Sequence, residues 1–139
     1  MHQPLLALGL LLAAGLIGTA NAAVDVTDDQ GQSIRLAQPA RRIVSLAPHV
    51  TELLYAAGAG DKVVGVVQYS DYPEAAKKVA RVGGYTSVDM EKVVALKPDL
   101  VVAWKSGNRE AHLDKLRGLG IPVFINEPRK IEDVARSLS

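Results

Sequence analysis

Aromatic side chains are scarce in this chain, and their spacing suggests what chemistry it could do. Of four tyrosines, one tryptophan and one phenylalanine, three lie at or just after the ends of predicted strands: Tyr69, Tyr72 and Trp104. Tyr85 lies in a glycine-containing loop that leads toward the same edge. Rigid aromatic faces bury much area at small entropic cost, and their O–H or N–H groups still reach polar edges of a ligand. The set predicts a binding site for a large, flat, partly apolar ligand, although each ring alone could simply pack against the next helix.

The residue types that usually carry catalysis form no convergent set. His49 and His112 are far apart, and neither belongs to a His-x-x-x-His or Glu-x-x-His pattern, so a cap or surface position is expected rather than a metal site. Ser45 and Ser70 lack the setting of an activated serine. The Gly-Ala-Gly at 58–60 follows a helix and precedes a strand, the reverse of a phosphate loop. We therefore predict a binding protein without catalytic residues, cofactor or metal.

Glu91 is an acidic residue that the sequence places near the start of a helix, on its exposed side. It falls early in a predicted helix, beside the apolar face formed by Met90 and Val94, so its carboxylate should point to solvent. An exposed carboxylate can dock to an arginine on a partner protein. It can also do no more than interact with the positive end of the helix dipole, and the residue pattern leaves both interpretations open.

The elements that must position these residues follow an α/β pattern. Two short runs around Asp-Asp-Gln-Gly at 28–31 predict an N-terminal hairpin over 24–36. Apolar runs then alternate with helical segments, which is typical of a parallel sheet flanked by crossover helices; the runs are 42–46, 62–68, 100–104 and 122–125. Ligands of such sheets bind outside the carboxyl ends of the strands. The loops that begin at Pro48, Tyr69, Trp104 and Asn126 should therefore converge.

The helices between these strands are predicted from N-cap residues at their starts and glycine or proline at their ends. They are expected at 51–57, 74–79 and 110–119, with a last one opening near Ile131. Ser87 is expected to cap the helix that carries Glu91, with Met90, Val93 and Val94 at core spacing.

Residues 1–22 have the pattern of a secretory leader. An uncharged apolar run over 4–18, too short to span a bilayer, precedes Ala20-Asn21-Ala22, which predicts cleavage after Ala22 and a mature domain over 23–139. The chain has no cysteine, which excludes a disulfide framework and a thiolate metal site. With a net charge of +1 and scattered basic residues, no nucleic-acid footprint is present, and a small-molecule or protein partner is expected.

Four segments together carry a family resemblance. They are Arg-Ile-Val-Ser-Leu-Ala-Pro at 42–48, Thr-Glu-Leu at 51–53, Tyr-Ser-Asp-Tyr-Pro at 69–73 and Val-Ala-Leu-Lys-Pro-Asp-Leu-Val at 94–101. Together they resemble the periplasmic binding proteins that bring vitamin B12, haem and iron-siderophores to ABC importers. The third segment, with Ala-Trp-Lys-Ser-Gly-Asn at 103–108, is similar to the B12 branch. The resemblance runs from about residue 41 to the end.

The resemblance implies a fold of two α/β lobes joined by a rigid helix, with the ligand between them. This chain reaches Ser139 inside its last predicted helix, so we expect only the N-terminal lobe, truncated before the linking helix and the second lobe. A half-site of this kind should lose affinity, because buried area and preorganisation both fall.

The resemblance also implies roles for the residues singled out above. Tyr69, Tyr85 and Trp104 would face a corrinoid, with Tyr72 as a further contact, and Glu91 would dock an arginine of the inner-membrane permease. We therefore expect the periplasmic solute-binding component of an ABC importer, with cobalamin or a related corrinoid as cargo. The alternatives are a haem or ferric-siderophore binder of the same class, a small α/β enzyme, and a stand-alone interaction domain or fragment that does not transport.

Overall fold

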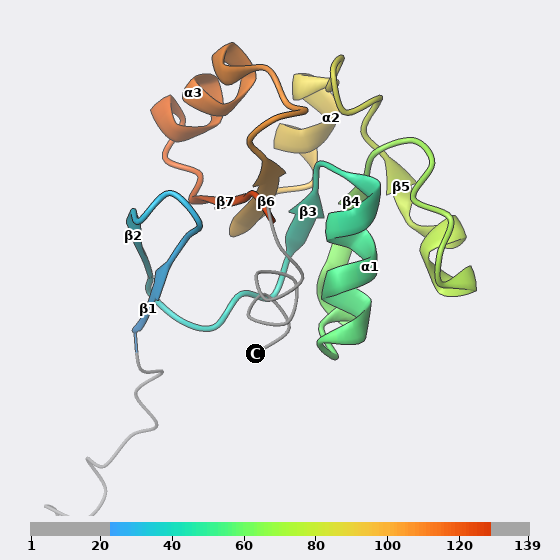
Figure 1. Cartoon of the computed structure of the whole chain (residues 1–139), viewed down its shortest axis with the longest axis horizontal. Coiled ribbons are helices and arrows are strands. Elements are labelled where there is room, and N and C mark those ends of the chain that lie inside the picture. Colours follow the sequence, from blue (N-terminus) through green and yellow to red (C-terminus); the bar gives the residue numbers. More distant parts are fainter. Residues whose placement is uncertain (1–22, 129–139) are drawn as a thin grey trace, which may run out of the picture.

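The structure, a computed structural model that describes residues 23–128, contains an antiparallel hairpin beside a parallel sheet (Figure 1). The hairpin pairs β1 (Val24–Thr27) with β2 (Ser33–Leu36). The sheet has five strands in the order β5-β4-β3-β6-β7. These strands are β3 (Ile43–Ser45), β4 (Val63–Val66), β5 (Ala80–Arg81), β6 (Leu100–Trp104) and β7 (Val123–Asn126). The predicted α/β class, with a parallel sheet and an N-terminal hairpin, is confirmed.

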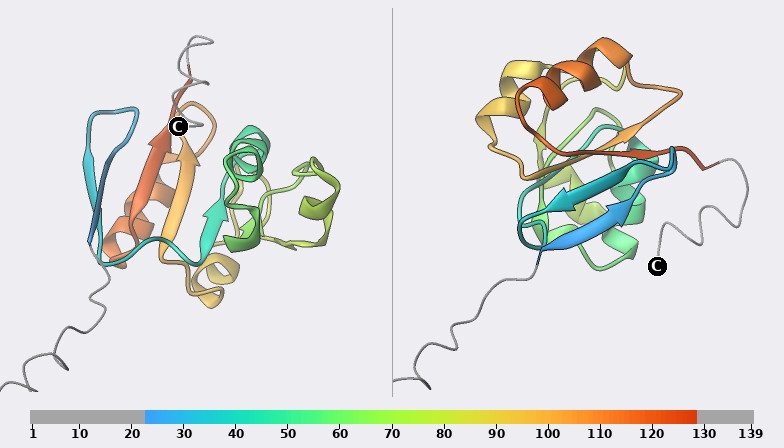
Figure 2. Two further views of the ribbon diagram at one scale, coloured as in Figure 1. Left: turned by 90° about the horizontal axis from the view of Figure 1, so that it is seen from below. Right: turned by 90° about the vertical axis from the view of Figure 1, so that its left-hand side faces the viewer.

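Helices cover both faces of this sheet. Figure 1 shows α1 (Pro48–Ala56) on one face and α2 (Met90–Ala95) and α3 (Glu110–Gly118) on the other, while Figure 2 shows the hairpin beside the β7 edge. Two short 3₁₀ turns, η3 (Gly60–Lys62) and η4 (Glu74–Lys78), complete the connections. Within residues 23–128 no helix is long and apolar enough to cross a membrane.

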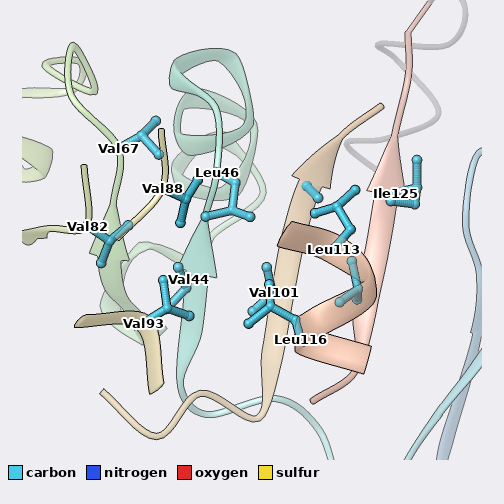
Figure 3. Packing of buried hydrophobic residues seen from close by; sticks show 12 residues of the cluster. Val44, Leu46, Val67, Val82, Val88, Val93, Val101, Leu113, Leu116 and Ile125 are labelled. Atoms are coloured by element: carbon cyan, nitrogen blue, oxygen red, sulfur yellow. The ribbon is translucent and has the colours of Figure 1, made fainter. Parts of the chain in front are cut away.

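The side chains of β6 alternate between two core clusters, as the period of a strand requires. Val101 and Ala103 join the cluster of α2 and α3, where Leu113 and Leu116 are fully buried (Figure 3). Leu100, Val102 and Trp104 belong to the cluster on the α1 face. Trp104 is therefore carried by the last position of the strand onto the α1 face, at the carboxyl edge of the sheet.

The structure corrects the prediction for α2. Its N-cap is Asp89, whose carboxylate accepts a hydrogen bond from the Lys92 N–H at 3.2 Å, and not Ser87. The backbone of Ser87 instead closes a turn onto Gly84, which keeps it outside the helix. With only six helical residues, α2 buries Val93 completely but leaves Val94 43% exposed. The expectation that Val94 is a core residue is therefore wrong.

The start of α1 differs from the prediction, one strand was not predicted, and two predicted segments lie outside the described residues. α1 begins at Pro48, three residues earlier than predicted, because proline is well suited to the first turn of a helix. β5 was not predicted at all. The predicted leader at 1–22 and the helix expected near Ile131 lie outside the described residues.

The turn of the hairpin is bonded to the end of β7. Asp28 accepts hydrogen bonds from the N–H groups of Gln30 and Gln32 at 3.0 and 2.9 Å, which closes the turn on its own backbone. The same carboxylate accepts a bond from the Ile125 N–H at 3.3 Å, and the Asp29 N–H donates to the Ile125 carbonyl at 3.0 Å. The hairpin therefore reaches the carboxyl edge of the sheet.

Candidate ligand-binding site

Trp104 is the centre of an aromatic cluster at this edge. Its ring centroid lies 5.2 Å from that of His49, with the planes at 84°, and 5.6 Å from that of Tyr85, with the planes at 54°. Inclined arrangements of this kind are favoured by the ring quadrupoles. The structure thus brings together Tyr85 and Trp104, from the predicted site, with His49, which the sequence assigned to a cap or surface position.

Asn108 ties the three segments of this cluster together. Its side-chain oxygen accepts a hydrogen bond from the backbone N–H of Trp104 at 2.6 Å. Its side-chain nitrogen donates to the backbone carbonyls of Leu46 and Tyr85 at 2.9 and 2.8 Å. Because Asn108 is itself buried, these bonds are shielded from water. The loop that carries Tyr85 is therefore fixed to both β6 and the end of β3.

Gly107 makes room for the indole ring. A Cβ atom on Gly107 would lie 2.0 Å from Cε3 and 2.3 Å from Cζ3 of Trp104. The ring consequently rests directly against the glycine backbone, and no larger residue fits at 107 without displacing it.

Tyr69 and Tyr72 lie in the loop after β4 and are 77% and 70% exposed. Tyr69 has a φ of 68°, in the left-handed region that only a few per cent of non-glycine residues adopt. Such a conformation costs of order 1–3 kcal/mol and persists only when surrounding contacts hold it. Among the described residues, the ring contacts at this site join Trp104 to His49 and Tyr85 and do not include Tyr69 or Tyr72.

Buried polar contacts hold the loop of Tyr69 in place. The Thr51 hydroxyl donates to the Ser70 hydroxyl at 3.0 Å and lies 2.8 Å from that of Ser45, and all three residues are buried. From the other side, Arg81 donates to the Ser70 carbonyl at 2.9 Å. The backbone on the C-terminal side of Tyr69 is therefore fixed while its ring stays in solvent.

Glu91 is exposed, as expected, and lies on the face of the sheet opposite α1. It lines a depression of about 340 Å³ between α2 and α3 together with Met90, Val94, Ala95 and Lys115. Glu91 thus belongs to a different surface from the aromatic cluster.

An apolar cavity of about 220 Å³ lies on the α1 face, between α1, the hairpin and the sheet. Its lining is aliphatic except for Phe124 and Asn126. A site for a drug-sized ligand is usually larger, about 300–1,000 Å³, with several convergent polar groups. We therefore place the candidate site at the Trp104 cluster and not in this cavity.

Comparison with known proteins decides the family. The family model of the periplasmic binding proteins matches residues 43–138. The chain belongs to this family. The family resemblance predicted from the sequence is thereby confirmed.

Similar periplasmic binding proteins include cobalamin and haem binders. A vitamin B12-binding protein from Yersinia pestis is 51% identical over 102 residues, which are 73% of this chain and 36% of that protein. The solved vitamin B12-binding protein of Vibrio cholerae matches with a TM-score of 0.69 and 46% identity, over 71% of this chain and 39% of that one. A heme-binding protein from Roseiflexus matches with a TM-score of 0.62 and 31% identity, over 71% and 41%. The chain thus spans well under half the length of the relatives it matches.

Two residues of this site were missed by sequence reasoning. His49 and Asn108 act through contacts with residues 55 and 62 positions away, which no local pattern reveals. Within residues 23–128, no group of three or more histidine, cysteine, aspartate or glutamate residues could hold a metal ion.

Proposed function

We propose that this chain is the solute-binding component of an ABC importer in the periplasm, and that its cargo is cobalamin or a related corrinoid. It would hold this cargo without catalysing a reaction and without a cofactor of its own. The observation that carries the proposal is the half-buried indole of Trp104, held beside Tyr85 where the carboxyl ends of the strands meet. The cobalamin-binding names of the relatives with 51% and 46% identity favour this cargo over haem.

The shape of the site supports a wide, flat ligand. Trp104 and Tyr85 are inclined at 54°, so a ring system that stacks on one meets the other obliquely. Tyr69 and Tyr72 add exposed rings on a neighbouring loop, and their hydroxyl groups can bond to polar edges of the ligand. A macrocycle with amide substituents presents both an apolar plane and such polar edges.

Cargo identity is best tested in a full-length context, because the chain spans only 36% of the Yersinia relative. We would replace the matched part of that protein with this chain's residues and titrate the chimaera calorimetrically with cyanocobalamin and, separately, with haem. Retained cobalamin binding is expected, with Trp104→Ala weakening it about 30-fold, the loss of 2 kcal/mol typical of a central aromatic contact. Leu119→Ala, an exposed apolar residue at the end of α3, is the matched control. A folded chimaera that gives no heat with cobalamin would refute the proposal, and binding of haem alone would change the cargo.

We further propose that Glu91 docks an arginine of the permease. Its carboxylate is exposed on the short helix α2, away from the aromatic cluster, so a partner could engage it while ligand is bound. In cells that lack their own binding protein, the chimaera with Glu91→Lys should bind cobalamin normally but fail to support its import. Glu52→Lys, at an exposed carboxylate on α1, is the control. Equal import by both variants would exclude docking through Glu91.

A further inference from the structure

A chain of contacts connects the hairpin turn to the indole of Trp104. Asn126 is the last residue of β7, and its side-chain amide contacts two residues. Its Oδ1 lies 3.0 Å from Nε2 of His49, and its Nδ2 lies 3.3 Å from Oδ2 of Asp29. His49 in turn lies nearly perpendicular to Trp104. Asp29, Asn126 and His49 thus form a line of polar contacts that ends at the central ring of the candidate site.

The carboxylate of Asp29 sets the direction of every hydrogen bond in this line. An ionised carboxylate only accepts, so the NH₂ group of Asn126 must face Asp29, and its oxygen must face His49. His49 consequently donates from Nε2, which fixes the Nε2–H tautomer of the neutral imidazole. Turning the Asn126 amide around would place its oxygen against the carboxylate of Asp29.

Two anchors hold the ends of this line. Asp29 also accepts a hydrogen bond from the Glu127 N–H at 2.8 Å and donates its own N–H to Ile125, so it is fixed on the end of β7. His49 follows Pro48 in the first turn of α1, where the backbone is rigid. The imidazole is therefore oriented from both sides before any ligand arrives.

We infer that His49 is a positioning residue: oriented by Asp29 through Asn126, it holds the indole of Trp104 in the orientation that the ligand meets. The inference rests on the proposed function for its ligand, but not for its geometry. It gives the hairpin, which pairs with no strand of the main sheet, a part in recognition. A histidine that merely filled space beside Trp104 would not depend on Asp29.

The test uses the ligand-free 139-residue chain and reads His49 and Trp104 directly. Nitrogen-15 NMR at mildly alkaline pH, where imidazoles are ordinarily neutral, should show the single Nε2–H tautomer for His49. Asp29→Asn keeps an acceptor for Glu127 but allows the Asn126 amide to turn, so both tautomers should appear. Since Trp104 is the chain's one tryptophan, its fluorescence reports on the site alone, and its emission and acrylamide quenching should change in this variant. Asp25→Asn, an exposed position on the same hairpin, should leave both signals unchanged.

A second variant keeps the inference testable if Asp29→Asn folds poorly. His49→Phe retains a ring but not the donor, so it should shift the Trp104 emission, and adding Asp29→Asn should then shift it no further. In the cobalamin-binding chimaera, either single variant should weaken affinity about three- to tenfold, as expected for one oriented aromatic contact. An Nδ1–H tautomer in the wild type, or Trp104 emission indifferent to both variants, would overturn the inference. Normal signals in the free chain with no cobalamin binding by the chimaera would instead refute the proposed cargo.

Discussion

Replacing Gly107 by alanine tests the site with a single methyl group. The new Cβ would lie 2.0, 2.3 and 2.8 Å from three ring atoms of Trp104, whereas ordinary contact begins at 3.4 Å. The indole must therefore withdraw by the difference between 3.4 and 2.0 Å, roughly 1.4 Å, and it can do so only by changing its contacts with His49 or Tyr85. The backbone at Gly107 is not left-handed, so alanine adds no backbone strain there and its effect comes from this clash.

The clash should weaken ligand binding more than it lowers the free energy of unfolding. Overpacking of a closed core costs about 1–3 kcal/mol, but Trp104 is half-buried and can move toward solvent. We expect the free energy of unfolding to fall by less than about 1 kcal/mol, because much of the overlap is relieved outward. Cobalamin affinity should fall at least about tenfold, because the ring that meets the ligand is displaced.

Three measurements on Gly107→Ala separate these effects. Urea unfolding gives the stability, fluorescence of the single tryptophan gives the position of the ring, and calorimetry on the chimaera gives the affinity. Gly118→Ala, at the end of α3, is the matched control, because its Cβ would meet nothing within 4 Å. Alanine is more favourable than glycine in a helix by about 0.5–1 kcal/mol, so this variant should not lose stability. Unchanged emission together with unchanged affinity in Gly107→Ala would show that the indole does not rest on residue 107 as described.

Three further changes test the supports of the fold. Thr51→Val should cost about 1–3 kcal/mol in urea unfolding, because the buried Ser70 hydroxyl loses its Thr51 partner and the Ser45 hydroxyl keeps only the Ala47 carbonyl. Thr51→Ser keeps the hydroxyl and should cost less. Asp89→Ala should cost about 1 kcal/mol by removing the cap of α2, and Asp89→Asn, which still caps, should not. Partial burial raises the pKa of Glu110, but hydrogen bonds and charges of Arg117 and Lys105 outweigh it and hold that pKa below its usual range. Its stabilisation is therefore fully present above the ordinary pKa of a glutamate and is lost as the pH falls through the lowered pKa, so Glu110→Gln should lower stability by about a few tenths of a kcal/mol at neutral pH and not in acid.

The main strands could be predicted because each is a buried apolar run. The runs at 42–46, 62–68 and 100–104 contain β3, β4 and β6, and the run at 122–125 covers β7 except for its last residue, Asn126. β5 escaped prediction because two residues, Ala80 and Arg81, carry no pattern and become a strand only by pairing with β4. Its place in the sheet is decided by tertiary contact and not by local preference.

The start of α2 shows how tertiary structure selects between two acceptable caps. Serine and aspartate are both good N-cap residues, so Ser87 and Asp89 compete on the sequence. In the structure Gly83 and Val88 form a bridge, and the Asp89 N–H donates to the carbonyl of Val82. These bonds hold Val88 and Asp89 beside residues 82 and 83, so the helix can begin only after Asp89.

The candidate site was predictable to the extent that it follows from strand order. Trp104 ends a recognisable strand, and the loop of Tyr85 was expected at the same edge. Asn108 and His49 could not be found in this way, because an asparagine or histidine has the same local pattern whether it is free or bonded across the sheet. Tyr69 and Tyr72 were correctly placed in a loop after a strand, but the sequence gives no sign that the ring contacts of Trp104 join it to His49 and Tyr85 and not to them.

The polar residues at this edge explain how a largely open aromatic site can be rigid. A half-buried indole gains too little from packing alone to hold one orientation, since part of its surface faces water. Here Asn108 fixes the backbone on which Trp104 sits, Gly107 sets how closely the ring approaches that backbone, and His49 limits its tilt. Each of these contacts exists in the absence of ligand, so little ordering remains to oppose binding. Affinity at such a site should therefore depend as strongly on these three supports as on the rings that touch the ligand.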